Sequence, residues 1–282
     1  MRFIAPSPES VCPSVFSRPP LGDWDAEFPA LLARPQWPAI IELDRARRAA
    51  DARDRIVRPA FVEQDAALLA DGLHYEQRVA AGVLATRRDN WHDLLNALVW
   101  LRYPRIKHAL NARQFAEIGE IGTTQRTRAQ CAMTHFDEAG AIVLCSDPDL
   151  IARWDAHDWH ALFCSRAASW GRQIAALVFG HALLEHALLP GQLLVGKALV
   201  LRVDQATVVA ASGQDVREHV DKRIAALIAA DAVLGDPQEL RPLPLSGIPG
   251  WHADAATASF VRDAPCFRPL RPGRRYPAPQ SL

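Results

Sequence analysis

Residues 86–104 read TRRDNWHDLLNALVWLRYP and carry the clearest structural signal in the chain. The leucines recur at helical spacing and form one apolar face. Asn90 is a favourable N-cap, and Asp93 follows three residues later as in a variant of the capping box. Pro104 ends this helix and can begin the next. The stretch predicts a helix that starts at Asn90, followed by a second helix over residues 105–115.

Helical periodicity extends to both sides of this pair. It predicts further helices over residues 24–33, 38–54, 149–156, 158–168 and 215–231. The apolar window 174–189 is interrupted by His181, Glu185 and His186, whose burial in lipid would be costly. A buried helix, entered from a strand, is therefore predicted there instead of a membrane span.

Strand signals are fewer. Residues 129–146 contain alternating side chains, the sequence Asp-Glu-Ala-Gly and then an apolar run, which is the pattern of a β-hairpin. A second strand is predicted at 196–203, with a partner strand at 207–211. Residues 75–85 stay ambiguous, because Gly82 lies where a turn could separate two short strands.

These elements predict an α+β fold, mainly helical, with one or two short β-hairpins. Residues 1–20 are rich in Pro and Ser and are predicted to form an extended arm, and residues 21–235 a single globular domain. Residues 236–282 are dense in Pro but contain aromatic anchors, so we expect an irregular extension packed on the domain and frayed after Arg274.

Charge and cysteine content narrow the class of protein. Lys plus Arg (32) equals Asp plus Glu (32), so nothing in the net charge indicates a nucleic-acid partner. The five cysteines are odd in number and contain no CxxC pair, which argues against a disulfide framework or a zinc ribbon. No secretory signal is visible at the start. A cytoplasmic location is expected.

The first candidate site surrounds the start of the predicted helix at Asn90. His92 and Asn96 lie along one side of that helix, and Arg87 and Asp93 flank its N-terminus, where free backbone N–H groups favour an anion. The alternative is that Asn90 and Asp93 only cap the helix, that the arginines are surface charge and that the histidine fills a polar niche.

The second candidate pairs His181 with Glu185, four residues apart in an apolar helix. This spacing places an imidazole and a carboxylate on one helix face, as metal ligation or a hydrogen-bonded base requires. The pair lacks the second histidine of HExxH. The alternative is a buried histidine satisfied by the glutamate.

The third candidate brackets the predicted hairpin. Arg126 and Arg128, one residue apart on a strand, would share a face and could bind a phosphate or carboxylate. Surface salt bridges explain them equally well. Asp137 and Glu138 are interpreted as turn residues in contact with solvent and not as paired catalytic carboxylates.

Familiar nucleotide and serine-hydrolase motifs are missing: the sequence contains no GxGxxG, GxxxxGK[ST] or GxSxG. However, several segments together resemble the bacterial family catalogued as domain of unknown function 3025. These segments are residues 86–100, Tyr103-Pro104-Arg105, Leu110-Asn111, Arg126-Thr127-Arg128, Phe136-Asp137-Glu138 and 179–185. The resemblance extends over about residues 28–269, and it implies no activity, ligand or catalytic residue.

The residues themselves favour a metal-assisted hydrolase acting on an anionic substrate, with phosphate esters first. His92, Asp93, His181 and Glu185 would supply the ligands of a divalent metal or the general base, and Arg87, Asn96, Arg126 or Arg128 would bind the substrate. This hypothesis requires the two histidine segments to meet in the fold. The alternatives are a non-catalytic module that binds a small anion or a protein, and a structural or assembly protein.

Overall fold

The computed structural model describes residues 6–122 and 125–282, and within them the chain has a mainly helical α+β fold, as predicted. The helices are α1 (Leu21–Glu27), α2 (Ile40–Asp54), α3 (Ala66–Leu69), α4 (Tyr75–Ala80), α5 (Trp91–Arg102), α6 (Pro104–Ile121), α7 (Arg128–Ala139), α8 (Pro148–Asp155), α9 (His181–His186), α10 (Gln205–Val209), α11 (Gln214–Ala229) and α12 (Ala258–Asp263). The strands are β1 (Ala60–Glu63), β2 (Val83–Thr86), β3 (Gly140–Cys145), β4 (Ile174–Val178), β5 (Val195–Arg202), β6 (Arg241–Pro244) and β7 (Gln280–Ser281).

The main sheet is built around β3. Its strand order is β4-β3-β5-β6, with β7 pairing with β5, and β3 runs antiparallel to β4 and parallel to β5. Every residue of β3 is buried, which explains why its sequence, GAIVLC, is an unbroken apolar run. Helices α7, α8 and α10 contact this strand.

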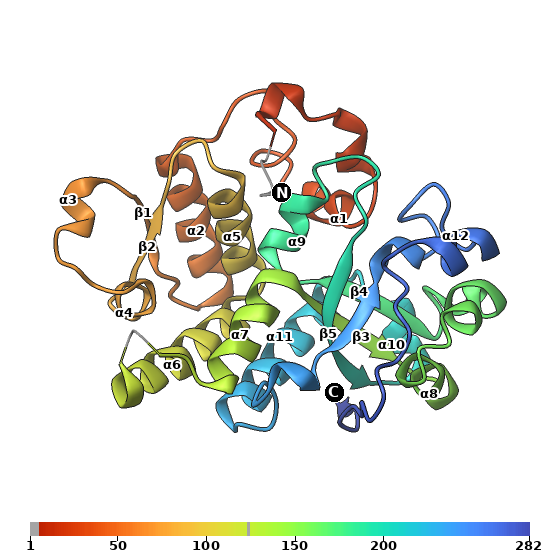
Figure 1. Ribbon diagram of the computed structural model, residues 1–282. Coiled ribbons are helices and arrows are strands. Elements are labelled where there is room, and N and C mark those ends of the chain that lie inside the picture. Colours follow the sequence, from red (N-terminus) through yellow and green to blue (C-terminus); the bar gives the residue numbers. More distant parts are fainter. Residues whose placement is uncertain (1–5, 123–124) are drawn as a thin grey trace.

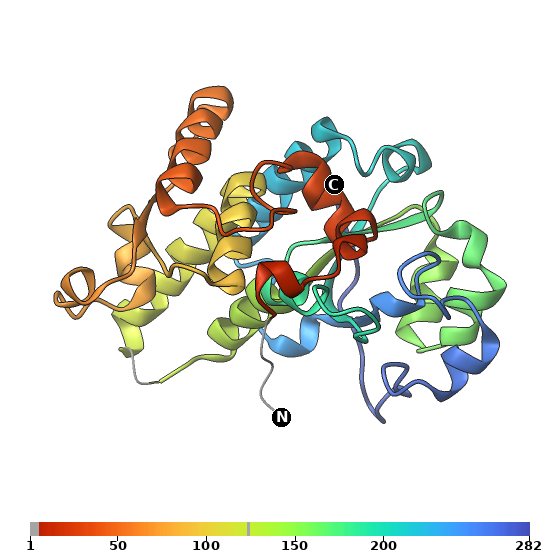
Figure 2. The same ribbon diagram turned by 90° about the horizontal axis from the view of Figure 1, so that it is seen from above.

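Helices α2 to α6 and the parallel pair β1–β2 lie beside this sheet (Figure 1). Figure 1 shows α2, α5 and α6 with β1 and β2 on one side, the main sheet on the other, and α7 and α9 between them. The view from above in Figure 2 keeps the same separation. Helices α5, α7 and α9 therefore meet where the two parts join, and α9 contacts both α5 and α7.

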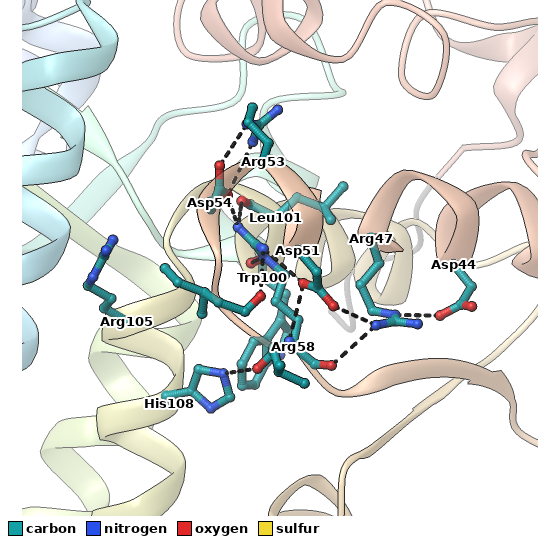
Figure 3. Close-up of polar contacts among 12 residues, drawn as sticks. Asp44, Arg47, Asp51, Arg53, Asp54, Arg58, Trp100, Leu101, Arg105 and His108 are labelled. Atoms are coloured by element: carbon teal, nitrogen blue, oxygen red, sulfur yellow. Dashed lines mark hydrogen bonds and ion pairs between the residues drawn. The ribbon is translucent and has the colours of Figure 1, made fainter. Parts of the chain in front are cut away.

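A buried arginine anchors the C-terminal end of α5. The side chain of Arg58 is fully buried, and its Nε and Nη2 donate to the main-chain carbonyls of Trp100 and Leu101, each at 3.0 Å. Its Nη1 donates to Asp51 at 2.9 Å, and Nη2 is paired with Asp54 (Figure 3). These last carbonyls of α5 have no partner within the helix, so Arg58 satisfies them and joins α5 to α2.

Most predicted helices are confirmed, but two predicted strands are wrong. Residues 128–139 of the proposed hairpin form α7, and its second half is β3, which pairs with β4 and β5. Thr127 and Gln130 form a capping box, with the Thr127 side chain accepting from the Gln130 N–H at 3.0 Å. Residues 205–209 form the short helix α10 instead of a strand. The Asp204 side chain caps this helix by accepting a hydrogen bond from the Thr207 N–H.

The C-terminal extension keeps contacts with the domain beyond Arg274, the point after which it was predicted to fray. Tyr276 hydrogen-bonds to His157 at 2.9 Å, and β7 adds to the main sheet through β5. Near the other terminus Val11 and Val15 are buried. Within the described ranges, no helix combines the length and hydropathy needed to cross a membrane.

Candidate functional site

Three helix ends bring His92, Glu138 and His181 together. His92 lies in the first turn of α5, Glu138 in the last turn of α7, and His181 is the first residue of α9. One ligand atom from each residue lies within 4.8 Å of the others. The two histidines, 89 residues apart in sequence, are in direct contact.

The N-cap at Asn90 fixes the position of His92. The Asn90 backbone is extended, and its side-chain oxygen accepts a hydrogen bond from the Asp93 N–H at 3.0 Å, as predicted. Helix α5 therefore starts at Trp91, and His92 projects from its first turn.

Two glycines allow α9 to approach the end of α7. The N–H groups of Phe179 and Gly180 both donate to the Gly140 carbonyl at 2.9 Å. A Cβ atom on Gly180 would lie 2.4 Å from the Gly140 nitrogen and 2.5 Å from the Glu138 carbonyl oxygen. Only glycine fits here, because its backbone touches another backbone, and this contact places His181 beside Glu138.

We expect Gly180→Ala to lower the free energy of unfolding by about 1–3 kcal/mol, because the added methyl group must push α9 away from α7. Equilibrium urea unfolding followed by tryptophan fluorescence measures the change. Gly119→Ala is the matched control, since nothing lies within 4 Å of its added Cβ and its backbone has no positive φ. Alanine is the better helix former, so this control should be stabilised by about 0.5–1 kcal/mol. An unchanged Gly180→Ala would contradict the close approach.

The distances suit a metal ion. Nε2 of His92 lies 3.0 Å from Nε2 of His181, and Oε2 of Glu138 lies 3.8 Å from the same His181 atom. In a tetrahedral zinc site with bonds of about 2.0–2.1 Å, neighbouring ligand atoms are about 3.3 Å apart. Without an ion, one ring must donate its N–H to the other. The same geometry therefore serves a three-ligand metal site or a hydrogen-bonded pair of imidazoles.

Burial keeps His181 neutral, as a metal ligand must be. Its side chain is 4% exposed, and burial lowers its pKa to about 3. Its second ring nitrogen, Nδ1, is buried without a well-formed hydrogen bond to the described residues. The site is thus closed on the His181 side and opens to solvent beside His92 and Glu138, whose side chains are 31% and 42% exposed.

Glu185 contacts His92 on the side of the imidazole ring opposite His181. Its Oε2 lies 3.4 Å from Nδ1 of His92, on the ring edge away from His181. Burial disfavours the charged form of His92, but the hydrogen bond that its Nδ1 donates to Glu185 and the charges of the nearby carboxylates outweigh burial and raise the pKa of His92. A carboxylate on the outer nitrogen of a histidine ligand is the usual arrangement that orients such a ring toward a metal.

A cavity of about 310 Å³ lies against this cluster. It is mostly polar, and its lining includes Tyr75, Glu76, Arg87, His92, Asp93, Asn96, Gln114, Arg126, Gln130, Thr134, Asp137, Glu138 and His181. A second, more open hollow on the surface is lined by His92, Glu138 and Glu185 and by the start of α5. Two of the three clustered residues, His92 and Glu138, therefore line both hollows.

Three of the predicted site residues line the cavity but are committed to other partners. Asp93 accepts from the Arg87 main-chain N–H at 2.7 Å and forms a two-point pair with the guanidinium of that residue. The Asp93 carboxylate therefore neutralises Arg87 and holds the segment before α5, and it is not one of the three clustered residues. Asn96 accepts from the buried Lys107 Nζ at 3.0 Å and donates to the Tyr75 hydroxyl at 3.1 Å.

The structure separates the two arginines that were predicted to share a face. Arg126 lines the cavity, and among the described residues it has no hydrogen bond or ion pair. Arg128 starts α7, is 64% exposed and pairs with Asp236 on the surface. The predicted strand is wrong, because Arg128 begins a helix, and the shared face that depended on it is lost. Anion binding by these arginines stays a prediction.

Several polar residues of the site were missed. Glu138 was interpreted as a turn residue, and Glu76, Lys107 and Asn111 were not selected at all. Glu138 could have been found from the Thr-x-x-Gln capping box at 127–130, because a helix from 128 places it in the last turn. The sequence signal for Lys107 is weaker, because it is only a lysine within the helical pattern of α6.

Comparison with known proteins gives a family and no activity. No curated protein and no solved structure matches the chain. One family, described as Protein of unknown function (DUF3025), matches residues 59–271, which include the histidine cluster, Glu138, Glu185 and the cavity-lining residues named above. This match covers well over half of the sequence, so the chain belongs to the DUF3025 family.

Proposed function

We propose that the chain is a metal-dependent hydrolase that acts on a small anionic ester. The observation that carries the proposal is the convergence of His92, Glu138 and His181, with Glu185 behind His92. Two histidines and one glutamate around an open position are a common ligand set for catalytic zinc. A divalent ion held there would supply an activated water at neutral pH.

The charge balance of the cavity favours an anionic substrate. Asp93 is neutralised by Arg87, and Asp137 by Lys107, whose Nζ lies 2.6 Å from it. Burial raises the pKa of Glu76, another cavity residue, to about 7, so it is counted here in its neutral form. The charges left at the site are then Arg126, the carboxylates of Glu138 and Glu185, and the ion itself. A divalent ion together with Arg126 exceeds the two carboxylates by one positive charge. A phosphate ester is the first substrate class to test, because a metal and an arginine together stabilise its oxygens.

The test starts with metal content and ends with hydrolysis. After incubation with zinc or manganese and dialysis, we expect about one ion per chain by elemental analysis. The loaded protein should hydrolyse p-nitrophenyl phosphate, and removal of the ion by a chelator should abolish the reaction. A chain that binds no ion would contradict the proposal and favour a non-catalytic binding module.

Arg126 should control substrate affinity. We expect Arg126→Gln to raise KM for p-nitrophenyl phosphate by about 10- to 150-fold, because one charge-assisted contact is worth roughly 1.5–3 kcal/mol, with a smaller effect on kcat. Arg128→Gln is the matched control, since Arg128 is two residues away and pairs with Asp236 outside the cavity. Equal effects of the two substitutions would show that the anion binds elsewhere.

A further inference from the structure

The cavity contains a carboxyl group that no cation of the described residues contacts directly. Glu76 lies in the first turn of α4, and its Oε2 accepts a hydrogen bond from Asn111 Nδ2 at 2.6 Å. The same amide nitrogen donates to the Glu76 main-chain carbonyl at 2.9 Å, so Asn111 holds the residue at two points. Within residues 6–122 and 125–282, no arginine, lysine or histidine forms an ion pair with Glu76.

Asp137 lines the same cavity in the opposite electrostatic setting. The Lys107 ammonium forms an ion pair with it, with Nζ 2.6 Å from Oδ1. Burial raises the pKa of Glu76 to about 7, and the negative charge of Asp137 acts in the same direction, while Asn111, Lys107 and Arg126 oppose it. One cavity therefore holds a carboxylate and a carboxyl group that keeps its proton up to neutral pH.

We propose that Glu76 is the general acid of the site, donating a proton to the leaving oxygen of the substrate. This inference rests on the proposed function. Water attacks phosphorus at the His92–Glu138–His181 cluster, the new oxygen–phosphorus bond forms, and the bond from phosphorus to the substrate's alcohol oxygen breaks. The electron pair stays on the alcohol oxygen, which takes the Glu76 proton. The proton released by the attacking water restores Glu76 through solvent, so alcohol and phosphate are the only products.

The role of Glu76 as a general acid also indicates the class of substrate. An alcohol is a poor leaving group and gains most from protonation, whereas an acidic phenol or a phosphate leaves without help. The structure therefore favours phosphate monoesters of aliphatic alcohols over anhydrides and over aryl esters. A cavity of about 310 Å³ is at the small end of the range for ligand sites, which suits a compact ester.

A stability titration tests the protonation of Glu76 without any substrate. A carboxyl whose pKa is higher in the folded than in the unfolded chain favours folding below its ordinary value of 4.5 and loses that contribution as pH rises to about 7. Relative to Glu76→Gln, the unfolding equilibrium constant of the wild type should increase about tenfold per pH unit in this window. A constant ratio between the two proteins would overturn the inference.

Leaving-group dependence tests the catalytic step. On metal-loaded protein, we expect Glu76→Gln to lower kcat/KM for glycerol 2-phosphate by about 10²–10⁴-fold and for p-nitrophenyl phosphate by less than about tenfold. The wild-type rate on glycerol 2-phosphate should also fall as pH rises through about 7, and the variant should lose this dependence. Glu120→Gln, an exposed residue of α6, is the control and should match the wild type.

The outcomes separate the two proposals. If the wild type hydrolyses both esters and Glu76→Gln loses the same factor on each, the acid role is wrong while the metal-dependent hydrolase stands. If the metal-loaded wild type hydrolyses neither ester, the proposed function is wrong and the acid role falls with it, even where the stability titration finds Glu76 protonated.

Discussion

Arg58→Met is expected to lower the free energy of unfolding by about 3–5 kcal/mol, the range for removing one partner of a buried ion pair. The substitution keeps most of the side-chain volume but removes every donor. Asp51 and Asp54, both less than 20% exposed, lose their buried cation. The carbonyls of Trp100 and Leu101 lose their hydrogen bonds at the end of α5. Urea unfolding measured by tryptophan fluorescence gives the change.

Arg53→Met is the matched control for this result. Arg53 pairs with the same Asp54 carboxylate, but its side chain is 61% exposed (Figure 3). Exposed ion pairs contribute about 0–1 kcal/mol, so this variant should stay within that range of the wild type. A loss below about 1 kcal/mol in Arg58→Met would mean that water replaces the guanidinium at the helix end, and that the network does not hold α5 in place.

The sequence predicted the helices because their signals are local. The Asn90 cap and the leucine spacing predicted the start of α5, and Pro104 predicted the start of α6. The hairpin at 129–146 failed because the sequence Asp-Glu-Ala-Gly has turn composition, whereas Gly140 lies where α7 ends and β3 begins. A Cβ atom on Gly140 would lie 2.2 Å from the carbonyl oxygen of Phe136 in the last turn of α7, so this glycine is needed at a helix-to-strand junction and not in a hairpin turn.

The candidate site was only half predictable for the same reason. His92, His181 and Glu185 were chosen from local chemistry, but their meeting depends on the Gly140–Gly180 contact between segments about 40 residues apart. Glu138 was missed because it was assigned to the turn of the predicted hairpin. Glu76 was missed because it belongs to a segment whose pattern was ambiguous between helix and strand. Local periodicity assigns a residue to a helix face, whereas only the tertiary packing of several helices determines which faces share a cavity.

The second large effect is expected for His181→Ala, which should remove metal binding. Three ligands hold the proposed ion, and His181 is the one that burial keeps neutral and fixed. Even residues that only orient a ligand typically change metal affinity by about 10–100-fold, so loss of a ligand should exceed about 100-fold. Zinc competition with a chromophoric chelator measures the affinity, and hydrolysis of p-nitrophenyl phosphate should fall to background.

Two further variants make this result decisive. His181 is buried, so its replacement leaves a cavity, whereas His92 is partly exposed and His92→Ala should lose the ion with a smaller loss of stability. His135→Ala removes an exposed histidine of α7 one turn before Glu138 and should leave one ion bound, which excludes adventitious binding by surface histidines. If His92→Ala and His181→Ala, folded as judged by circular dichroism, keep wild-type affinity, the 3.0 Å contact between the two rings is a hydrogen bond within a polar core and not a metal site.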